Sequence, residues 1–159
     1  MYINIQRSND DIKLPSRAHD SDSGWDLFTP YAFSLKANER ITIPLWVKFE
    51  IKIPYFFKIL KIFGISLSVE AMIRPKSGRS KSGIECSIGT IDQNFRGFVS
   101  CTLHNFTNKK INLKKHEKIC QIVFMPVFAG KNFKLNETLK EISLKTERGA
   151  NGFGSSGVK

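Results

Sequence analysis

Long uncharged apolar runs are missing from this chain of 159 residues. Their absence excludes a membrane-spanning helix, which needs about 20 consecutive apolar residues. Residues 1–17 also lack a basic segment followed by a long apolar stretch, so the sequence predicts no cleaved leader peptide. We therefore expect a cytoplasmic protein, or a nuclear one as well if the source is eukaryotic. The length and the hydrophobic content of 41% are typical of one folded domain.

Cysteine and histidine are scarce, with three residues of each. Cys86, Cys101 and Cys120 are odd in number and show no C-x-x-C spacing, and the histidines are not clustered. This argues against both a disulfide framework and a zinc site. We expect three reduced thiols packed in the protein interior.

Acidic residues are outnumbered, because 14 Asp and Glu face 25 Lys and Arg and leave a formal net charge of +11. Such a charge attracts polyanions. A nucleoside triphosphate and a nucleic acid both fit this property, and the charge does not choose between them.

One segment alternates apolar and polar residues with a period of two. Its apolar positions are Ile41, Ile43, Leu45, Val47, Phe49, Ile51 and Ile53. The alternation predicts a β-strand with one buried face. Pro44 has no backbone N–H, so we expect an edge position, a bulge or a break near it.

Shorter β-like runs are separated by turns rich in Gly, Pro, Asn and Lys. They occupy residues 2–5, 98–103, 119–127 and 133–135. This spacing predicts an all-β fold, a sandwich or barrel of short strands. We find no internal repeat and no linker, and expect residues 1–146 to form one β domain.

An insertion at about residues 54–67 departs from the strand pattern. It carries apolar residues at helical spacing, which predicts a short helix: Phe56, Ile59, Leu60 and Phe63. Its mixture of lysines and bulky apolar residues is compatible with a membrane-surface or partner-binding element. It is also compatible with an insertion packed on its own sheet or at a subunit interface.

The segment 147–159 is rich in glycine and serine and has no apolar periodicity. It cannot bury enough surface to fold alone, so one interpretation is a flexible, disordered end. Arg148, Ser155 and Ser156, together with glycine amides, also provide the donors that a phosphate chain requires. The second interpretation is an arm that closes over a bound nucleotide.

Five separated motifs resemble those of the trimeric dUTPase family, in the family's order and over nearly the whole chain. Residues 89–97 read Gly-Thr-Ile-Asp-Gln-Asn-Phe-Arg-Gly, close to the family's Gly-x-Ile-Asp-x-x-Tyr-Arg-Gly. The other four occupy residues 22–27, 71–84, 115–122 and 147–157. Each motif alone is weak, but the third and fifth together are specific. The resemblance implies a dUTPase-like β-barrel or jelly roll with a flexible C-terminal arm.

The resemblance implies hydrolysis of dUTP to dUMP and pyrophosphate, which limits uracil in DNA and supplies dUMP for thymidylate synthesis. Attack of water at the α-phosphorus needs a base, and a carboxylate can take the proton. We predict that Asp92 is this base. The surrounding segment is expected to form a hairpin that mimics pairing with uracil, with the backbone of Cys86, Gly89, Thr90 and Ile91 reading the base.

The remaining predicted substrate contacts also follow the family pattern. Phe95 stands where the family has a tyrosine under the deoxyribose, and its ring preserves the steric exclusion of a 2′-hydroxyl. The predicted phosphate contacts, and the arm residues that would close on the triphosphate and the uracil, are Lys76, Ser77, Gly78, Gln121, Arg148, Phe153, Gly154, Ser155 and Ser156. Lys76 replaces an arginine, so its contact is a point charge instead of a bidentate fork. His116 and Asn151 replace glycines.

Magnesium is implied by the triphosphate, whose charge it neutralises. The resemblance suggests that Asp26 reaches the Mg²⁺ ion through water, and a buried structural role for this carboxylate is an equal alternative. It also implies a homotrimer whose sites are shared between subunits, with no specific nucleic acid as partner.

Two rival functions remain open from the sequence. A dCTP deaminase shares this fold, but it is expected to carry a glutamate in the hairpin. The Asp92 carboxylate and the Arg-Gly pair after Phe95 favour the pyrophosphatase. A non-catalytic nucleotide- or nucleic-acid-binding module would fit the charge and the basic insertion. The residues that weigh against it are Asp92, Gln121, Arg148 and Phe153.

Overall fold

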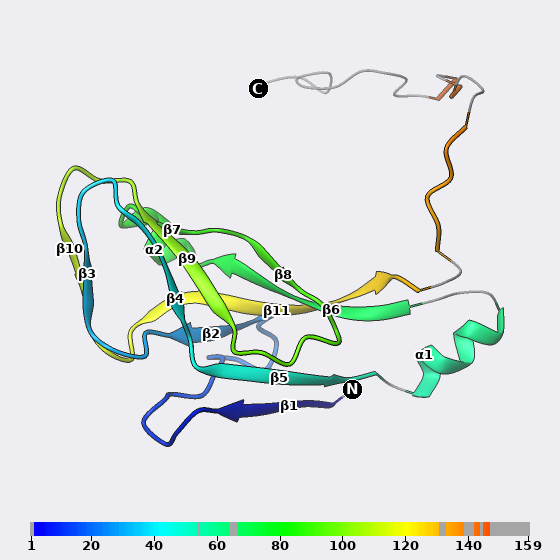
Figure 1. Ribbon diagram of the computed structural model, residues 1–159, viewed down its shortest axis with the longest axis horizontal. Coiled ribbons are helices and arrows are strands. Elements are labelled where there is room, and N and C mark those ends of the chain that lie inside the picture. Colours follow the sequence, from blue (N-terminus) through cyan, green and yellow to red (C-terminus); the bar gives the residue numbers. More distant parts are fainter. Residues whose placement is uncertain are drawn as a thin grey trace.

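The computed structural model describes residues 2–53, 55–63, 67–130, 133–138, 142–143 and 145–146, without the side chains of Lys58 and Lys61. Short strands dominate this part of the chain (Figure 1), and the all-β prediction is confirmed. The strands are β1 (Tyr2–Arg7), β2 (Gly24–Phe28), β3 (Phe33–Leu35), β4 (Arg40–Pro44), β5 (Val47–Lys52), β6 (Leu67–Pro75), β7 (Ile84–Cys86), β8 (Gly89–Ile91), β9 (Ser100–Asn105), β10 (Ile111–Leu113) and β11 (Lys118–Phe128). The helices are α1 (Tyr55–Leu60), η1 (Lys61–Phe63) and α2 (Ser77–Lys81).

The strands form four sheets with antiparallel pairing. The largest sheet has the order β2-β11-β6-β8, and the second has the order β4-β9-β7. The pairs β1-β5 and β3-β10 complete the described sheets. β11 lies at the centre of the largest sheet, since it pairs with β2 on one side and along its length with β6 on the other.

The alternating segment that begins at Ile41 is divided between two sheets. β4 ends at Pro44 and pairs with β9, whereas β5 begins at Val47 and pairs with β1. Trp46, between them, adopts a φ of 56°, a left-handed conformation that ends a strand. Hydrogen bonds through the Val99 backbone hold this corner, with Leu45 N–H donating to Val99 O and Val99 N–H donating to Val47 O, both at 2.8 Å. The predicted break near Pro44 is confirmed.

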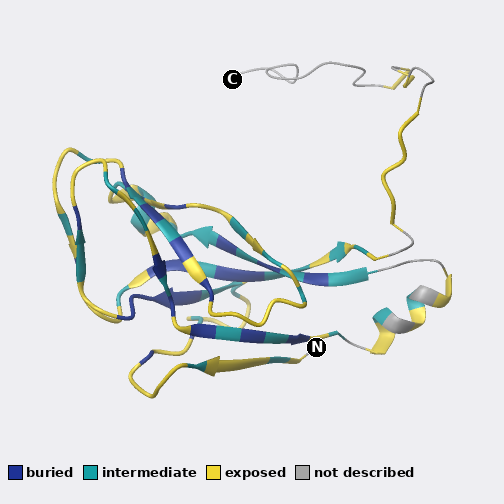
Figure 2. Ribbon diagram, in the orientation of Figure 1, coloured by how far each residue is buried: buried dark blue, intermediate teal, exposed yellow. Residues whose placement is uncertain are grey.

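Apolar side chains from both larger sheets meet in one core. Figure 2 shows that buried positions occur along β5, β6, β9 and β11. The largest fully buried side chains include Leu27, Leu35, Leu103, Ile119 and Ile122. All three cysteines are free and buried, as expected.

The predicted helix in the insertion is confirmed by α1 and η1, which leave Tyr55, Phe56 and Phe63 mostly exposed. The strand predicted at residues 133–135 is wrong. The described residues 133–138 form no ladder, and Leu135 is 97% exposed. Phe133 instead stacks on Phe128, with ring centroids 5.9 Å apart. No described strand pairs with this segment, and its local apolar pattern alone does not make a strand.

Candidate active site

A pocket of about 270 Å³ lies beside β8, at one edge of the largest sheet. Its lining consists of Ile73, Gly89, Thr90, Ile91, Asp92, Phe95, Phe98, Val99 and Ser100. β8 pairs with β6 on one side, and no described strand covers its other side. An edge strand of this kind presents backbone N–H and C=O groups to whatever lies next to it. The pocket therefore combines peptide hydrogen-bonding groups with apolar walls.

Gly89 opens β8 and has free space in front of it. A Cβ atom built at this position would meet no heavy atom within 4 Å, so the space in front of Gly89 is open. Gly89 pairs with Ile73 of β6, and Thr90 pairs with Met72, which fixes the register of β8 relative to β6. A flat ligand can approach the backbone here closely.

Asp92 follows β8 directly and is exposed at the pocket. Its backbone carbonyl accepts a hydrogen bond of 2.9 Å from Phe95 N–H, which closes a tight turn. In the described part of the chain its carboxylate makes no hydrogen bond and no ion pair. The group is therefore available to accept a proton from a bound molecule.

The turn after Asp92 is held by side chains of the third motif and of β6. Arg96 Nη1 donates to Gln93 O at 2.7 Å and to Phe95 O at 2.9 Å. The Ser68 hydroxyl of β6 donates to Gln93 Oε1. These bonds tie the turn to itself and to the sheet, and so they fix the position of the carboxylate.

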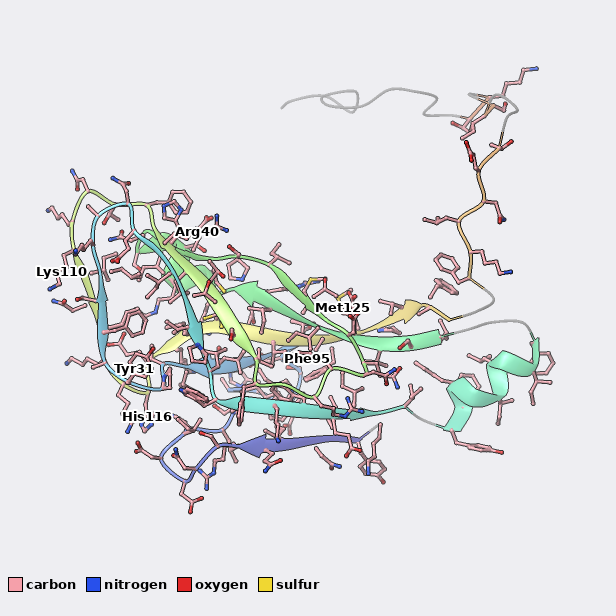
Figure 3. The ribbon with its side chains drawn as sticks, in the orientation of Figure 1. Tyr31, Arg40, Phe95, Lys110, His116 and Met125 are labelled. Carbon is pink, nitrogen blue, oxygen red and sulfur yellow. The ribbon has the colours of Figure 1, made fainter. Side chains whose placement is uncertain are left out.

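Phe95 projects from this turn and is 46% exposed (Figure 3). Its ring lies over Gly97, where a Cβ atom would come within 2.6 Å of Phe95 Cζ. Gly97 is thus needed for the ring to occupy this place. The exposed aromatic face stands in the same pocket as Asp92 and the β8 edge.

The hairpin expected around Asp92 is not formed. β8 pairs only with β6, and the next strand, β9, pairs with β4 and β7 in the second sheet. Residues 92–99 form a connection between sheets. The strand after the turn leaves the β8 edge uncovered, which creates the pocket.

Asp26 of β2 occupies a second site and is buried between two lysines. Lys76 Nζ donates to Asp26 Oδ1 at 2.6 Å, and Lys118 Nζ lies 2.7 Å from Asp26 Oδ2. Burial opposes ionisation, but the hydrogen bonds from Lys118 and Lys76 outweigh it and hold the pKa of Asp26 below its usual value. This geometry is that of a structural ion pair, the second role that the sequence left open for this carboxylate.

Gln121 lies near this second site, on β11. Its Nε2 donates to Pro75 O at 3.0 Å, and its side chain fills the space beside Gly24, where a Cβ atom would come within 2.2 Å of Oε1. Ser77 and Gly78 come directly after Lys76, at the start of α2, and both are exposed. The four residues predicted to contact phosphate in the described part of the chain, Lys76, Ser77, Gly78 and Gln121, thus flank the end of β6.

The structure does not bring all predicted residues together. The side chain of Cys86 is buried, and its backbone pairs with Leu103 of β9, away from the β8 edge. Arg148, Phe153, Gly154, Ser155 and Ser156 lie outside the described residues. Ile73, Phe98, Val99 and Ser100 line the pocket but were not predicted. The available signals were the position of Ile73 within the second motif and the proximity of Phe98, Val99 and Ser100 to the third.

Magnesium has no evident protein cage in the described part of the chain. No group of three or more potential ligands there includes a carboxylate. The Asp26 oxygens face two ammonium groups, which disfavours a nearby divalent cation. The described residues therefore do not fit a protein-held Mg²⁺ ion.

An exposed carboxylate and an aromatic ring beside an open strand edge define a site suited to a small planar ligand. The sequence model of the dUTPase family matches residues 10–157. The deoxyuridine 5'-triphosphate nucleotidohydrolase of Clostridium novyi (strain NT) is 33% identical over 161 residues, which cover 99% of this chain and 100% of that protein. The chain belongs to the dUTPase family.

Solved structures show the same fold. The dUTPase of Staphylococcus bacteriophage 80alpha with dUpNHpp superposes with a TM-score of 0.79 at 20% identity, covering 99% of both chains. A mutant dUTPase from phage phi11 of S. aureus, described with a structural Mg(II) ion, has a TM-score of 0.70 at 16% identity. That match covers 87% of this chain and 99% of the phage chain.

Proposed function

We propose that this protein hydrolyses dUTP to dUMP and pyrophosphate by in-line attack of water at the α-phosphorus. The observation that carries the proposal is the exposed, unpaired Asp92 carboxylate in the pocket at the β8 edge. A general base needs a carboxylate that is free to take a proton from water. Asp92 meets this requirement, whereas Asp26, held between two lysines, does not. The product dUMP would supply thymidylate synthesis, and removal of dUTP would limit uracil in DNA.

Different pocket residues would recognise the base and the sugar of the nucleoside. The free backbone groups of Gly89, Thr90 and Ile91 would pair with the edge of uracil. The ring of Phe95 would pack against the deoxyribose and leave no space for a 2′-hydroxyl. Both contacts select by shape and hydrogen bonding, and a base with a different donor pattern would leave peptide groups unpaired.

The phosphates would be bound by groups near the end of β6 and by the C-terminal arm. Ser77 and Gly78 offer a hydroxyl and an exposed backbone amide at the start of α2. Gln121 offers an amide once it leaves Pro75 O. We propose that residues 147–159 form an arm, with Arg148 on the γ-phosphate, Phe153 on the uracil, and Gly154, Ser155 and Ser156 along the phosphates. Magnesium would arrive bound to the triphosphate, as part of the substrate.

We also propose a homotrimer with shared sites, acting in the cytoplasm. The pocket that holds Asp92 contains none of Lys76, Ser77 or Gln121. Residues 133–138 lead away from the strands (Figure 1), with Leu135 almost fully exposed. Both features suit a chain that lends groups to its neighbours. None of the described helices has the length and apolar character needed to cross a membrane.

The activity is tested by measuring pyrophosphate release from dUTP, dCTP, dTTP and UTP at equal concentration, with Mg²⁺ and with excess chelator. We expect magnesium-dependent release from dUTP alone. Ammonia release from dCTP would point to the deaminase instead. Binding of dUTP without any pyrophosphate release would show that the protein is a non-catalytic nucleotide-binding module.

Sharing of sites is tested by coexpressing two inactive chains, Asp92→Asn and Arg148→Ala. If the base and the arm of each site come from different subunits, random assembly gives about one quarter of the sites both wild-type groups. Activity should then return to about that fraction of wild-type turnover. Mixed trimers with no recovered activity would show that both residues act within one chain.

A further inference from the structure

The three cysteines, far apart in the sequence, meet in the core. Cys86 lies on β7, Cys101 on β9 and Cys120 on β11, so they come from three strands in two sheets. Their sulfur atoms all lie within 4.8 Å of one another, and each residue is at most 4% exposed. No disulfide joins them. The proposed hydrolysis makes no use of these thiols.

The spacing of the sulfur atoms is close to what a three-coordinate metal requires. With metal–sulfur bonds of about 2.3 Å, a planar arrangement places the sulfurs about 4.0 Å apart. The observed sulfur–sulfur distances are at most 4.8 Å, slightly more than the spacing that such an ion requires. Small rotations of the side chains would bring all three sulfurs onto one ion.

The sulfur atoms are separated from the nearest surface pocket by the sheet itself. That pocket, of about 190 Å³, is lined by Arg40, Glu85, Cys86, Ser87, His104 and Phe106. Glu85 and His104 are paired across β7 and β9 on the pocket side, whereas the next pair, Cys86 and Leu103, is buried on the opposite face. An ion would therefore reach the thiols through local opening of these strands.

We propose that Cys86, Cys101 and Cys120 form a binding site for one thiophilic d10 cation, of the Cu(I) class. Thiolates select soft cations over Mg²⁺ or Ca²⁺. Structural zinc takes four ligands, and the described residues supply no fourth ligand within the cluster. Each thiol that binds the ion gives up its proton to solvent.

The test is an anaerobic titration of the reduced full-length protein against Cu(I) held by the dye bicinchoninate. We expect the wild-type chain to withdraw one Cu(I) from the dye. Cys101→Ala should leave Cu(I) on the dye, because two ligands hold it more weakly than three. The matched control is Val69→Ala, which also creates a cavity at a buried strand position but removes no thiol. It should withdraw Cu(I) as the wild-type chain does.

Thermal unfolding of the wild-type protein keeps the proposal testable even if Cys101→Ala does not fold. A site formed only in the folded protein raises the Tm when Cu(I) is added, whereas thiols that bind only after unfolding lower it. A raised Tm supports the site. A lowered Tm, or Cu(I) that stays with the dye in the presence of wild-type protein, overturns it and leaves three packed thiols.

Discussion

Two carboxylates of this chain lie in opposite surroundings. Asp92 is exposed at the open β8 edge and, in the described part of the chain, makes no ion pair, whereas Asp26 is 6% exposed and is held between Lys76 and Lys118. Both residues belong to family motifs. The resemblance implied a general base at Asp92, and for Asp26 it left a water-mediated Mg²⁺ contact and a structural role as equal alternatives. The contrast teaches that a carboxylate able to act as a base is one whose charge the protein has left uncompensated.

The largest expected effect follows from removing the free carboxylate. Asp92→Asn keeps the shape of the side chain but cannot accept the proton of water. We expect turnover to fall by about a thousandfold, within the usual range for loss of a general base, with dUTP affinity nearly unchanged. Single-turnover kinetics and calorimetric titration with a non-hydrolysable dUTP analogue measure the two quantities separately. An equal loss of affinity would place Asp92 in binding instead.

The matched substitution at the second carboxylate should damage stability. Asp26→Asn leaves two lysine ammonium groups facing each other beside a buried amide. We expect the free energy of unfolding to fall by about 2 kcal/mol, less than for a fully buried pair because both lysines are partly exposed. Urea unfolding measures this loss, and Asp92→Asn is its control, since it should leave stability unchanged. Full stability in Asp26→Asn would mean that the ion pairs contribute nothing.

Glycines in the two regions should also respond differently to one added methyl group. Gly89→Ala meets open space, so we expect unchanged stability but a KM for dUTP raised about tenfold, because the methyl group blocks the base. Gly24→Ala collides with Gln121 and should lower the Tm. Steady-state kinetics and thermal unfolding of both variants compare them. An unchanged KM for Gly89→Ala would show that the uracil of dUTP does not bind at the β8 edge.

The smallest expected effect is a difference in acid stability. The pKa of Asp26 is depressed below 3.8 in the folded chain, so its contribution is complete above 3.8 and is lost as the pH falls through the lower folded value. Between about pH 6 and about pH 3, wild-type stability should therefore fall more than that of Asp26→Asn. Other carboxylates titrate equally in both proteins, so the difference between the two urea curves isolates Asp26. Parallel losses in the two proteins would contradict the depressed pKa.

Sequence reasoning succeeded where one residue forces a local outcome. Pro44 cannot donate to a ladder, and the strand ends there. His116 stands at a glycine position of the family motif and adopts a φ of 63°, the left-handed conformation that a glycine would take. Its Nε2 lies 2.9 Å from Asp11 O, a contact that helps to hold the turn.

Sequence reasoning failed where distant segments decide the outcome. The two lysines around Asp26 follow it by 50 and 92 positions, and only the ordering of β2, β11 and β6 brings the three together. The three thiols likewise meet through sheet packing, which their positions in the sequence do not reveal. The prediction of a strand at residues 133–135 was wrong because it rested on a local pattern alone. None of the described strands pairs with this segment.

The open edge of β8 has a further consequence for the behaviour of the protein in concentrated solution. Unpaired strand edges are the places where protein chains add to one another and aggregate. β8 is only three residues long, and the turn after Asp92 interrupts it, so a foreign strand could form only a short ladder there. A bound nucleotide would occupy the same hydrogen-bonding groups. Bound substrate would then slow aggregation, and the protein should remain soluble for longer in its presence.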